Sequence, residues 1–195
     1  MLGTMVDRRR QQIIEMACKR FANKGFTGSS MRELAADMGL EASSLYTYIQ
    51  SKDDLLQDIC FSMGNKLITA IDEVNDIYFN AEEKLRLAIK NHVEIICADS
   101  NASKVFTHEW RHLQEIKKNE FIILRNKYEQ GFTEIINTGE TEQIFAEGDK
   151  RFAVLTILSA VNWISEWYNP KGKMKPSEIA QKLADFVLTG LKKPI

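Results

Sequence analysis

The sequence predicts an all-α protein, and three observations lead to that fold class. Its three prolines all lie after position 169, so no proline interrupts a helix in the long stretch before it. Apolar residues recur at intervals of three and four over most of the chain, which is the period of a helix that buries one face. No segment alternates apolar and polar residues as a half-buried strand does. We therefore expect short helices in the first quarter of the chain and longer helices after it.

Local signals mark the first helix and the start of the second. Ile13, Ala17 and Phe21 form an apolar stripe, and Gly25 is a C-terminal stop signal. Ser30 and Glu33 have the spacing of a capping box, in which each side chain accepts a hydrogen bond from the other residue's backbone N–H. The second helix is therefore expected to begin directly after Ser30.

Residues 31–50 have the pattern of two very short helices packed tightly together. Helices this short are not stable alone in water, so the pair must pack against its neighbours. Ala35 and Gly39 are small and let the two helices cross at a steep angle. The pair is either an ordinary helical hairpin or a helix-turn-helix, whose second helix enters the major groove of DNA. Its expected apolar contacts are Leu34, Met38, Leu40, Leu45, Tyr48 and Ile49.

The rest of the chain is predicted to be a series of longer helices. Ser51 and Asp54 repeat the serine–acid spacing and open a helix that runs toward Asn75. Polar segments with glycines, at 137–149 and 169–177, are expected to be loops. Further helices are expected at roughly 81–98, 102–115, 117–137, 150–168 and 177–191.

The composition is that of an ordinary globular protein, with 44% hydrophobic and 27% charged residues. There is no run of about 18 apolar residues, so no membrane span is expected. The N-terminus lacks the apolar segment of a signal peptide, and three scattered cysteines favour a reducing compartment, so we expect a cytoplasmic protein. The translation start stays open between Met1 and Met5.

Charge is distributed unevenly along the chain. Residues 1–52 hold eight Lys/Arg against five Asp/Glu, a net charge of +3, whereas the rest carries −4 and the whole chain −1. A basic N-terminal segment favours contact with DNA. Lys52 lies at the unfavourable end of the next helix dipole, so a phosphate there would be bound by both the lysine and the helix N-terminus. The alternative is that Asp53 and Asp54 already offset the lysine.

The run GFTGSSMRELAADMGLEASSLYTYIQSKDDLL, residues 25–56, resembles the DNA-binding segment of the TetR/AcrR family of bacterial regulators. The resemblance is carried by Gly25-Phe26, Ser29-Ser30, Arg32, Ala35, Gly39, Leu45-Tyr46 and Ser51-Lys52. It implies a three-helix helix-turn-helix domain over 1–52 and a helical ligand-binding and dimerisation domain over 53–195. It also implies a non-enzymatic repressor that binds a palindromic DNA operator as a homodimer and is released by a small effector. Activation instead of repression stays open.

The expected DNA-reading helix departs from the family pattern. Family members often carry Lys-Gly-Thr where this sequence has Ala42-Ser43-Ser44, so no Lys or Arg lies between residues 41 and 50. A bidentate arginine contact to guanine from this helix is excluded, and we expect readout through hydroxyls, a methyl group and DNA shape. Glu41 is expected to be the N-cap of this helix rather than a reader of cytosine. The predicted DNA-binding residues are Arg8, Arg9, Arg10, Ser29, Ser30, Arg32, Ala42, Ser43, Ser44, Tyr46, Thr47, Tyr48 and Lys52.

In the resembled family the last two helices form the dimer interface, and the other helices after the DNA-binding segment enclose a ligand pocket. Residues 152–168 are apolar on nearly all sides, which indicates a helix that is buried from several directions. Carried over to this sequence, the dimer interface consists of Phe152, Leu155, Leu158, Ile179, Leu183, Phe186, Val187 and Leu191.

Segments 106–116, 162–172 and 176–191 resemble more loosely a branch of the family that regulates fatty-acid, steroid and aromatic degradation. Several members of that branch respond to acyl-CoA thioesters as effectors. This implies a small hydrophobic effector, with acyl-CoA as the candidate, in an apolar cavity with a basic mouth, and no cofactor. Ordinary core or dimer packing is the alternative for each aromatic residue. The predicted ligand-binding residues are Phe61, Met63, Leu67, Ile96, Phe106, Trp110, Arg111, Arg125, Tyr128, Phe132, Trp163 and Trp167.

The sequence bears on three rival functions. His108 and His112 have the spacing of a zinc-binding pair, but no third ligand is evident, so we predict no metal. An enzyme is disfavoured because the sequence lacks the nucleophile-elbow, P-loop, dinucleotide-binding and zinc-protease motifs. A helical scaffold that binds other proteins is the remaining alternative, and a salt-dependent affinity for duplex DNA would discriminate against it.

Overall fold

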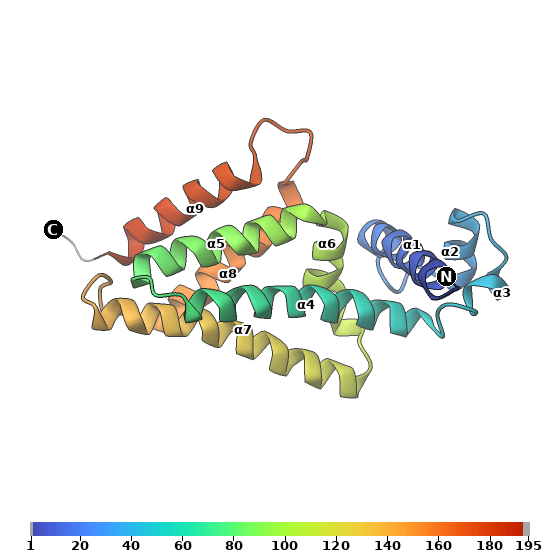
Figure 1. Cartoon of the computed structure of the whole chain (residues 1–195), viewed down its shortest axis with the longest axis horizontal. Coiled ribbons are helices and arrows are strands. Elements are labelled where there is room, and N and C mark those ends of the chain that lie inside the picture. The colour runs from blue at the N-terminus through green and yellow to red at the C-terminus, as the bar shows by residue number, and fades with distance from the viewer. Residues whose placement is uncertain (1, 193–195) are drawn as a thin grey trace. The chain divides into compact units, whose positions relative to one another are not determined.

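The computed structural model describes the backbone of residues 2–192 and the side chains of residues 7–192, and this part of the chain is helical (Figure 1). It forms nine α-helices and one 3-10 helix and contains no strand, so the predicted all-α fold is confirmed. The elements are α1 (Leu2–Lys24), α2 (Met31–Asp37), α3 (Ala42–Leu45), α4 (Lys52–Asp76), α5 (Ala81–Ala98), α6 (Ser100–His108), η1 (Glu109–His112), α7 (Glu115–Thr141), α8 (Lys150–Trp167) and α9 (Pro176–Leu191).

The chain divides into two compact units. The first contains residues up to Gly64 together with Asn101–Ile122, and the second contains Asn65–Ser100 together with residues from Ile123 onward. Helices α4 and α7 each begin in the first unit and end in the second. The first unit therefore includes α6 and η1 as well as the predicted helix-turn-helix, and it extends beyond the functional division that we expected at residue 52.

Several predicted boundaries are confirmed by local hydrogen bonds. Helix α1 ends at Lys24 because Gly25 has a φ of 75°, and its N–H donates to the carbonyl of Phe21 at 2.9 Å. The capping box of Ser30 and Glu33 opens α2. Ser51 accepts a hydrogen bond from the N–H of Asp54 at 3.1 Å at the start of α4. Serine–acid spacing was therefore a reliable signal for both helix starts.

Three predicted boundaries differ from the structure. The α-helix expected over 102–115 ends at His108 and tightens into η1. Helix α3 spans only Ala42–Leu45 before the chain turns, with Glu41 as an N-cap residue that makes no side-chain capping bond. Helix α7 continues to Thr141, so the expected loop over 137–149 begins later.

Gly139 explains the longer α7, because it is a packing site rather than a stop signal. The buried ring of Phe145 lies directly against it, and a Cβ atom at residue 139 would be 2.0 Å from that ring. The N–H groups of Ile144 and Phe145 both donate to the carbonyl of Gly139. The absence of a side chain thus lets the chain fold back onto its own helix end.

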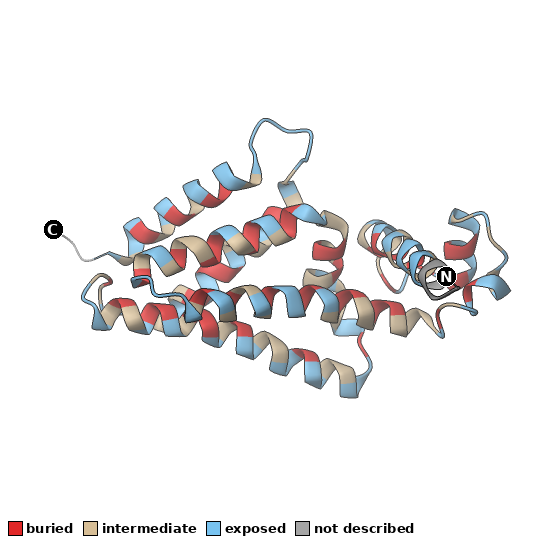
Figure 2. Cartoon of the chain, viewed as in Figure 1, coloured by how far each residue is buried: buried red, intermediate tan, exposed pale blue. Residues whose placement is uncertain are grey.

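The core of each unit is built from the predicted apolar stripes (Figure 2). In the first unit Ile13, Ala17 and Phe21 of α1 are buried, together with Leu34 of α2 and Leu45 of α3. In the second unit α5 packs against both α8 and α9. Its buried residues are Ala81, Leu85, Ala88, Ile89, His92, Val93, Ile96 and Cys97.

Candidate functional site

Arg20 joins α1 to α2, the first helix of the helix-turn-helix. Its guanidinium on α1 pairs with Asp37 at 2.6 Å and with Glu33 at 2.8 Å, both on α2. The hydrogen bond to Asp37 is the main cause that raises the pKa of Arg20. Hydrogen bonds from Ser30 lower the pKa of Glu33. Glu33 therefore caps α2 and also ties it to α1.

The exposed residues of α3 and of the turn after it are polar and uncharged, whereas Glu41, directly before α3, is exposed and acidic. Ser43, Ser44, Tyr46 and Thr47 are exposed, and Ala42 and Tyr48 are half-buried. The apolar side chain of Leu45 is fully buried beneath them. Arg32 on α2 is also exposed. These predicted DNA-binding side chains are therefore at least partly accessible to solvent.

The two predicted DNA-binding serines before α2, Ser29 and Ser30, have internal partners. Ser29 is buried, and its Oγ donates to the carbonyl of Gly25 at 2.8 Å. Ser30 is exposed, but its Oγ donates to Glu33 at 2.8 Å and accepts from the Glu33 N–H at 3.2 Å. The side chain of Ser29 therefore serves the turn before α2 and does not reach the surface.

The three predicted arginines at the start of α1 differ in their surroundings. Arg8 is exposed. Arg9 donates to the neutral side chain of Gln12 at 3.0 Å, which leaves its charge uncompensated by that contact. Arg10 forms an ion pair with Asp58 of α4. Of these three arginines, Arg10 is the one whose positive charge is offset by a carboxylate, that of Asp58.

Lys52, at the first position of α4, is held inward. Its Nζ donates to the carbonyls of Phe26 and Ser29, both at 2.9 Å, and lies 4.1 Å from the centroid of the Phe26 ring. We call residues 25–29 the Phe26 turn. An ammonium group has three N–H donors, so one remains for a DNA phosphate. The phosphate contact of Lys52 stays a prediction, and the structure adds a role in holding this turn.

The 3-10 helix η1 holds the Phe26 turn from another direction. The backbone N–H of Phe26 donates to Oε2 of Glu109 at 2.9 Å. The ring of His112 stacks on the Phe26 ring, with centroids 5.7 Å apart and planes at 21°. His112 Nε2 lies 3.8 Å from Glu109 Oε2. Sequence reasoning missed the two contacts with Phe26 because they join residues more than 80 positions apart.

Part of the predicted ligand-binding set forms an aromatic cluster in the first unit. The rings of Phe61, Phe106 and Trp110 lie 5.6, 5.5 and 5.7 Å from the ring of Phe121, measured between centroids. Phe121, at the centre, was not predicted, although it shares one face of α7 with Tyr128 and Phe132. That helical spacing is the signal that would have found it.

Two further predicted residues of this unit lie near the cluster or in the core. The Arg111 guanidinium lies over the Trp110 ring, 4.9 Å from its centroid. Met63 is buried. Arg111 is exposed, so its cationic side chain is the accessible one beside the aromatic rings.

In the second unit a buried histidine lies next to two predicted residues. Nδ1 of His92 is 2.7 Å from the Tyr128 hydroxyl, and the Tyr128 ring meets Phe132 edge-on at 5.4 Å. Burial lowers the pKa of His92 to about 3. Burial also raises the pKa of Tyr128. Leu67 and Ile96 are buried in this unit, and Arg125 is half-buried.

Large apolar side chains are exposed along one face of α8. We call Phe152, Leu155, Trp163 and Trp167 of α8, together with Phe186 of α9, the α8 stripe. The exposed fractions are 70% for Phe152, 41% for Leu155, 64% for Trp163, 46% for Trp167 and 79% for Phe186. Trp163 and Trp167, which were predicted to bind ligand, therefore lie on the outer surface of their unit.

The predicted dimer residues divide into two groups. Phe152, Leu155 and Phe186 belong to the α8 stripe, and Leu183, Val187 and Leu191 are half-buried. Leu158 and Ile179 are buried within the chain itself. A hollow of about 570 Å³ lies at one end of the stripe, and Phe152, Phe186 and Leu191 are among the residues that line it.

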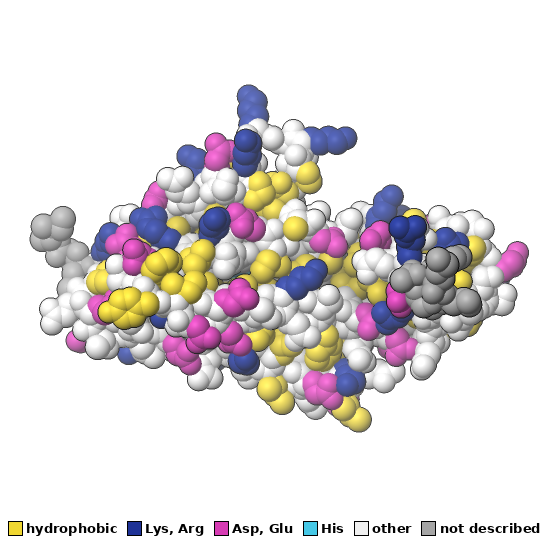
Figure 3. Space-filling view, in the orientation of Figure 1, with side chains coloured by type: hydrophobic (Ala, Val, Ile, Leu, Met, Phe, Trp, Pro, Cys, Tyr) yellow, Lys and Arg dark blue, Asp and Glu magenta, His cyan; other side chains and the backbone are white. Residues whose placement is uncertain are grey.

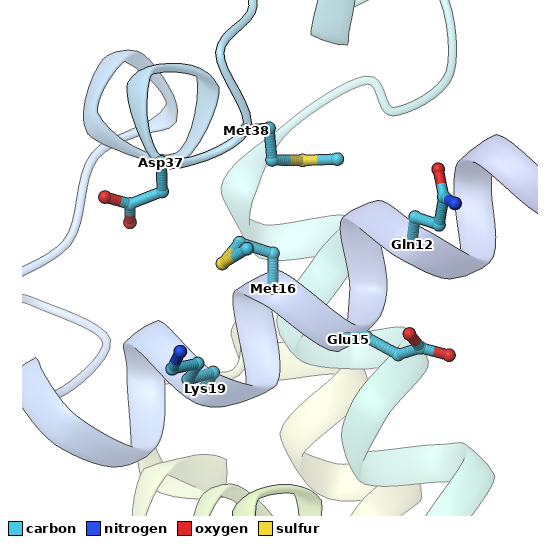
Figure 4. A pocket seen from close by; sticks show the side chains of 6 residues that line it. All are labelled: Gln12, Glu15, Met16, Lys19, Asp37 and Met38. Atoms are coloured by element: carbon cyan, nitrogen blue, oxygen red, sulfur yellow. The ribbon is translucent and has the colours of Figure 1, made fainter.

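Two other surface features are a pocket on the first unit and a lysine-rich loop in the second. A hollow of about 490 Å³ on the first unit is lined by Gln12, Glu15, Met16 and Lys19 of α1 and by Asp37 and Met38 at the end of α2 (Figure 4). Lysine or arginine side chains project from the loop between α8 and α9 (Figure 3), where Lys171, Lys173 and Lys175 are exposed. Neither feature includes a predicted DNA-binding or ligand-binding residue.

The described residues offer neither a metal site nor a membrane-spanning helix. Within them, no three His, Cys, Asp or Glu side chains come together in a way that would hold a metal ion, and His112 instead lies beside Glu109. None of the described helices has both the length and the apolar composition that crossing a bilayer requires.

The described chain is helical and has an N-terminal helix-turn-helix whose second helix, α3, carries exposed polar side chains. These features are those of a DNA-binding transcriptional regulator. Residues 13–59 match the family model of bacterial regulatory proteins of the tetR family, and residues 79–191 match the tetracyclin repressor-like C-terminal domain. The protein belongs to the TetR family and is a regulator, not an enzyme.

Relatives and solved structures agree with this family. The transcriptional repressor KstR2 of Mycobacterium tuberculosis H37Rv is 24% identical over 190 residues, covering 96% of this chain and 95% of its own. Its ketosteroid regulator structure aligns with a TM-score of 0.90 at 21% identity, covering 95% of this chain and 96% of that one. The fatty acid metabolism regulator of Bacillus subtilis 168 is 24% identical over 185 residues, covering 92% and 94%. The structure of AibR with isovaleryl coenzyme A and operator DNA aligns with a TM-score of 0.80 at 24% identity, covering 96% and 100%.

Proposed function

We propose that this protein is a cytoplasmic repressor that binds a palindromic operator as a homodimer and releases it when an acyl-CoA-like effector binds. The observation that carries the DNA-binding part is the set of exposed hydroxyl side chains on and after α3, in the same unit as Arg8, Arg9 and Arg32. The arginines would supply sequence-independent phosphate contacts, and the hydroxyls around α3 would supply base contacts. Residues 1–52 would form the DNA-binding domain and residues 53–195 the ligand-binding and dimerisation domain.

The α8 stripe supports the homodimer. Monomeric proteins rarely leave several large aromatic side chains exposed on one helix face, because covering them is favourable. A two-fold axis would bring the stripes of two identical copies together in a self-complementary contact. We assign Trp163 and Trp167 to this dimer face rather than to the ligand pocket. A dimer would place two DNA-reading helices about 34–36 Å apart, the length of one turn of DNA.

The effector class is supported by relatives and by the aromatic side chains. AibR was solved with isovaleryl coenzyme A, and the Bacillus subtilis relative is named for fatty acid metabolism. In this chain the cluster of Phe61, Phe106, Trp110 and Phe121 offers an apolar environment for an acyl chain. Arg111, in the same unit as the cluster, is the candidate partner of the coenzyme A phosphates. Effector binding would move the helix that begins near Ser51 and so break the match to the operator.

An acyl-CoA is expected to weaken operator binding, and operator DNA is expected to weaken acyl-CoA binding by the same factor. The measurement is a titration of the labelled operator duplex with isovaleryl-CoA, octanoyl-CoA and palmitoyl-CoA, followed by calorimetry of the thioester with and without operator. Coenzyme A alone is the matched control for the acyl chain. If no thioester changes operator affinity at saturation, acyl-CoA is not the effector class.

Replacing Lys52 by Ala is expected to weaken binding to all DNA sequences and to destabilise the fold. The lost phosphate contact would reduce the slope of log affinity against log salt by about 0.9. The two carbonyls that lose their charged donor would reduce the free energy of unfolding by about 1–3 kcal/mol. Salt-dependent DNA binding and urea unfolding measure the two effects separately. A stability loss with an unchanged salt slope would assign Lys52 to the Phe26 turn alone.

A further inference from the structure

We propose that Glu109 is a positioning residue that holds the Phe26 turn for DNA binding and links it to the aromatic cluster. This inference rests on the proposed function, since it specifies how that regulator would be controlled. All residues involved lie in the first compact unit. The hydrogen bond from the Phe26 N–H to Glu109 Oε2, at 2.9 Å, is the contact that carries it.

The Phe26 turn lies between α1 and α2, directly before the helix-turn-helix pair. Its conformation therefore determines the orientation of α2 relative to α1. Gly25 has a positive φ, and Ser29 hydrogen-bonds back to the Gly25 carbonyl. Lys52 binds the carbonyls of Phe26 and Ser29. The backbone N–H of Phe26 donates to Glu109, so the N–H and the carbonyl of Phe26 each have a side-chain partner. Loss of this acceptor would leave a part-buried N–H without its partner, which favours rearrangement of the turn.

The geometry of η1 connects this contact to the aromatic cluster. In a 3-10 helix, residues three apart eclipse each other, so Glu109 and His112 lie on one side. Both contact Phe26, through its N–H and its ring. Trp110 lies on another side of the same turn and packs against Phe121, next to Phe61 and Phe106. A ligand that displaces Trp110 would therefore rotate the short helix that carries Glu109.

The charge of Glu109 makes its predicted effect on DNA binding distinctive. Removing a carboxylate from a DNA-binding protein ordinarily strengthens its attraction to the phosphate backbone. Replacing Glu109 by Ala is expected to do the opposite and to weaken operator binding about tenfold, because the Phe26 turn is released. Glu109→Gln loses the same charge but keeps an oxygen that can accept from the Phe26 N–H, so it is expected to stay within about threefold of the wild type.

Glu115→Ala is the matched control. Glu115 is exposed, lies in the first turn of α7 in the same unit, and its replacement removes the same charge. It is expected to bind operator as tightly as the wild type or slightly more tightly. The thermal midpoints of all variants are measured alongside, so that a general loss of folding is recognised.

The decisive measurement combines operator affinity with hydrogen exchange of the Phe26 amide, in the full-length protein and without effector. Glu109→Ala is expected to speed Phe26 exchange about tenfold and to weaken operator binding, while Glu115→Ala changes neither. An unchanged Phe26 exchange rate in Glu109→Ala would overturn the proposal. So would faster exchange with unchanged operator affinity, since Glu109 would then be merely structural.

The same variants, titrated with isovaleryl-CoA, octanoyl-CoA and palmitoyl-CoA, test the link to the cluster. If a thioester weakens wild-type operator binding, this effect is expected to shrink in Glu109→Ala and to persist in Glu115→Ala; equal effects in both would refute the link. If no thioester acts on the wild type, the proposed effector class fails, while the effector-free measurement still decides the role of Glu109.

Discussion

Lowering the pH from 7 to 5 is expected to remove about 2 kcal/mol of folding free energy through His92 alone. The pKa of His92 lies near 3 in the folded chain, against an ordinary value of 6.5, because the ring is buried. The unfolded state therefore binds a proton more readily than the folded state. The stabilisation is complete above pH 6.5, falls by about 1.4 kcal/mol per pH unit below it, and levels off near pH 3.

Urea unfolding at pH 7 and pH 5 measures this effect when the wild type is compared with His92→Gln. Glutamine does not titrate, but its amide can hydrogen-bond Tyr128 as the imidazole does. The variant is expected to lose about 2 kcal/mol less than the wild type between the two pH values. The same pH dependence in both proteins would show that His92 is accessible to protons in the folded state.

Replacing Phe152 and Phe186 together by Glu is expected to convert the proposed dimer into a monomer. These two side chains are 70% and 79% exposed in the single chain, so the substitutions do not disturb its core. In a dimer they would place four carboxylates in an apolar contact, where desolvation and like-charge repulsion both oppose association. We expect the dimer dissociation constant to rise at least about a hundredfold and operator affinity to fall with it.

Analytical ultracentrifugation measures this directly, since one chain has a mass of 22.4 kDa. Tyr78→Glu is the matched control, because Tyr78 is a fully exposed aromatic residue outside the α8 stripe. The control is expected to sediment as the wild type does, at twice the mass of one chain. A double variant that still sediments as a dimer would exclude the α8 stripe as the interface.

The helices were predictable from sequence because their signals are local. The stripe of Ile13, Ala17 and Phe21 and the capping box at Ser30 depend only on residues within one or two turns. The end of α7 was not predictable in this way. Gly139 has the same local appearance as a stop signal, and only the Phe145 ring folded back onto it shows why the helix continues.

The candidate site was predicted in its residue types but not in its pairings. Arg10 and Lys52 were identified as cations. The sequence did not reveal that Arg10 pairs with Asp58 or that Lys52 donates to two backbone carbonyls. Trp163 and Trp167 were treated as pocket residues because an aromatic side chain has the same sequence signal in a pocket and in an interface. Burial distinguishes the two, and burial is a property of the fold.

The most direct test of the central claim is selection of genomic fragments from the source organism by the purified protein, followed by sequencing. A dimeric repressor is expected to enrich one short inverted repeat with half-sites about one DNA turn apart. The genes beside it would then indicate the effector. No enriched sequence, after removal of any co-purified ligand, would contradict operator binding and favour a helical scaffold that binds other proteins.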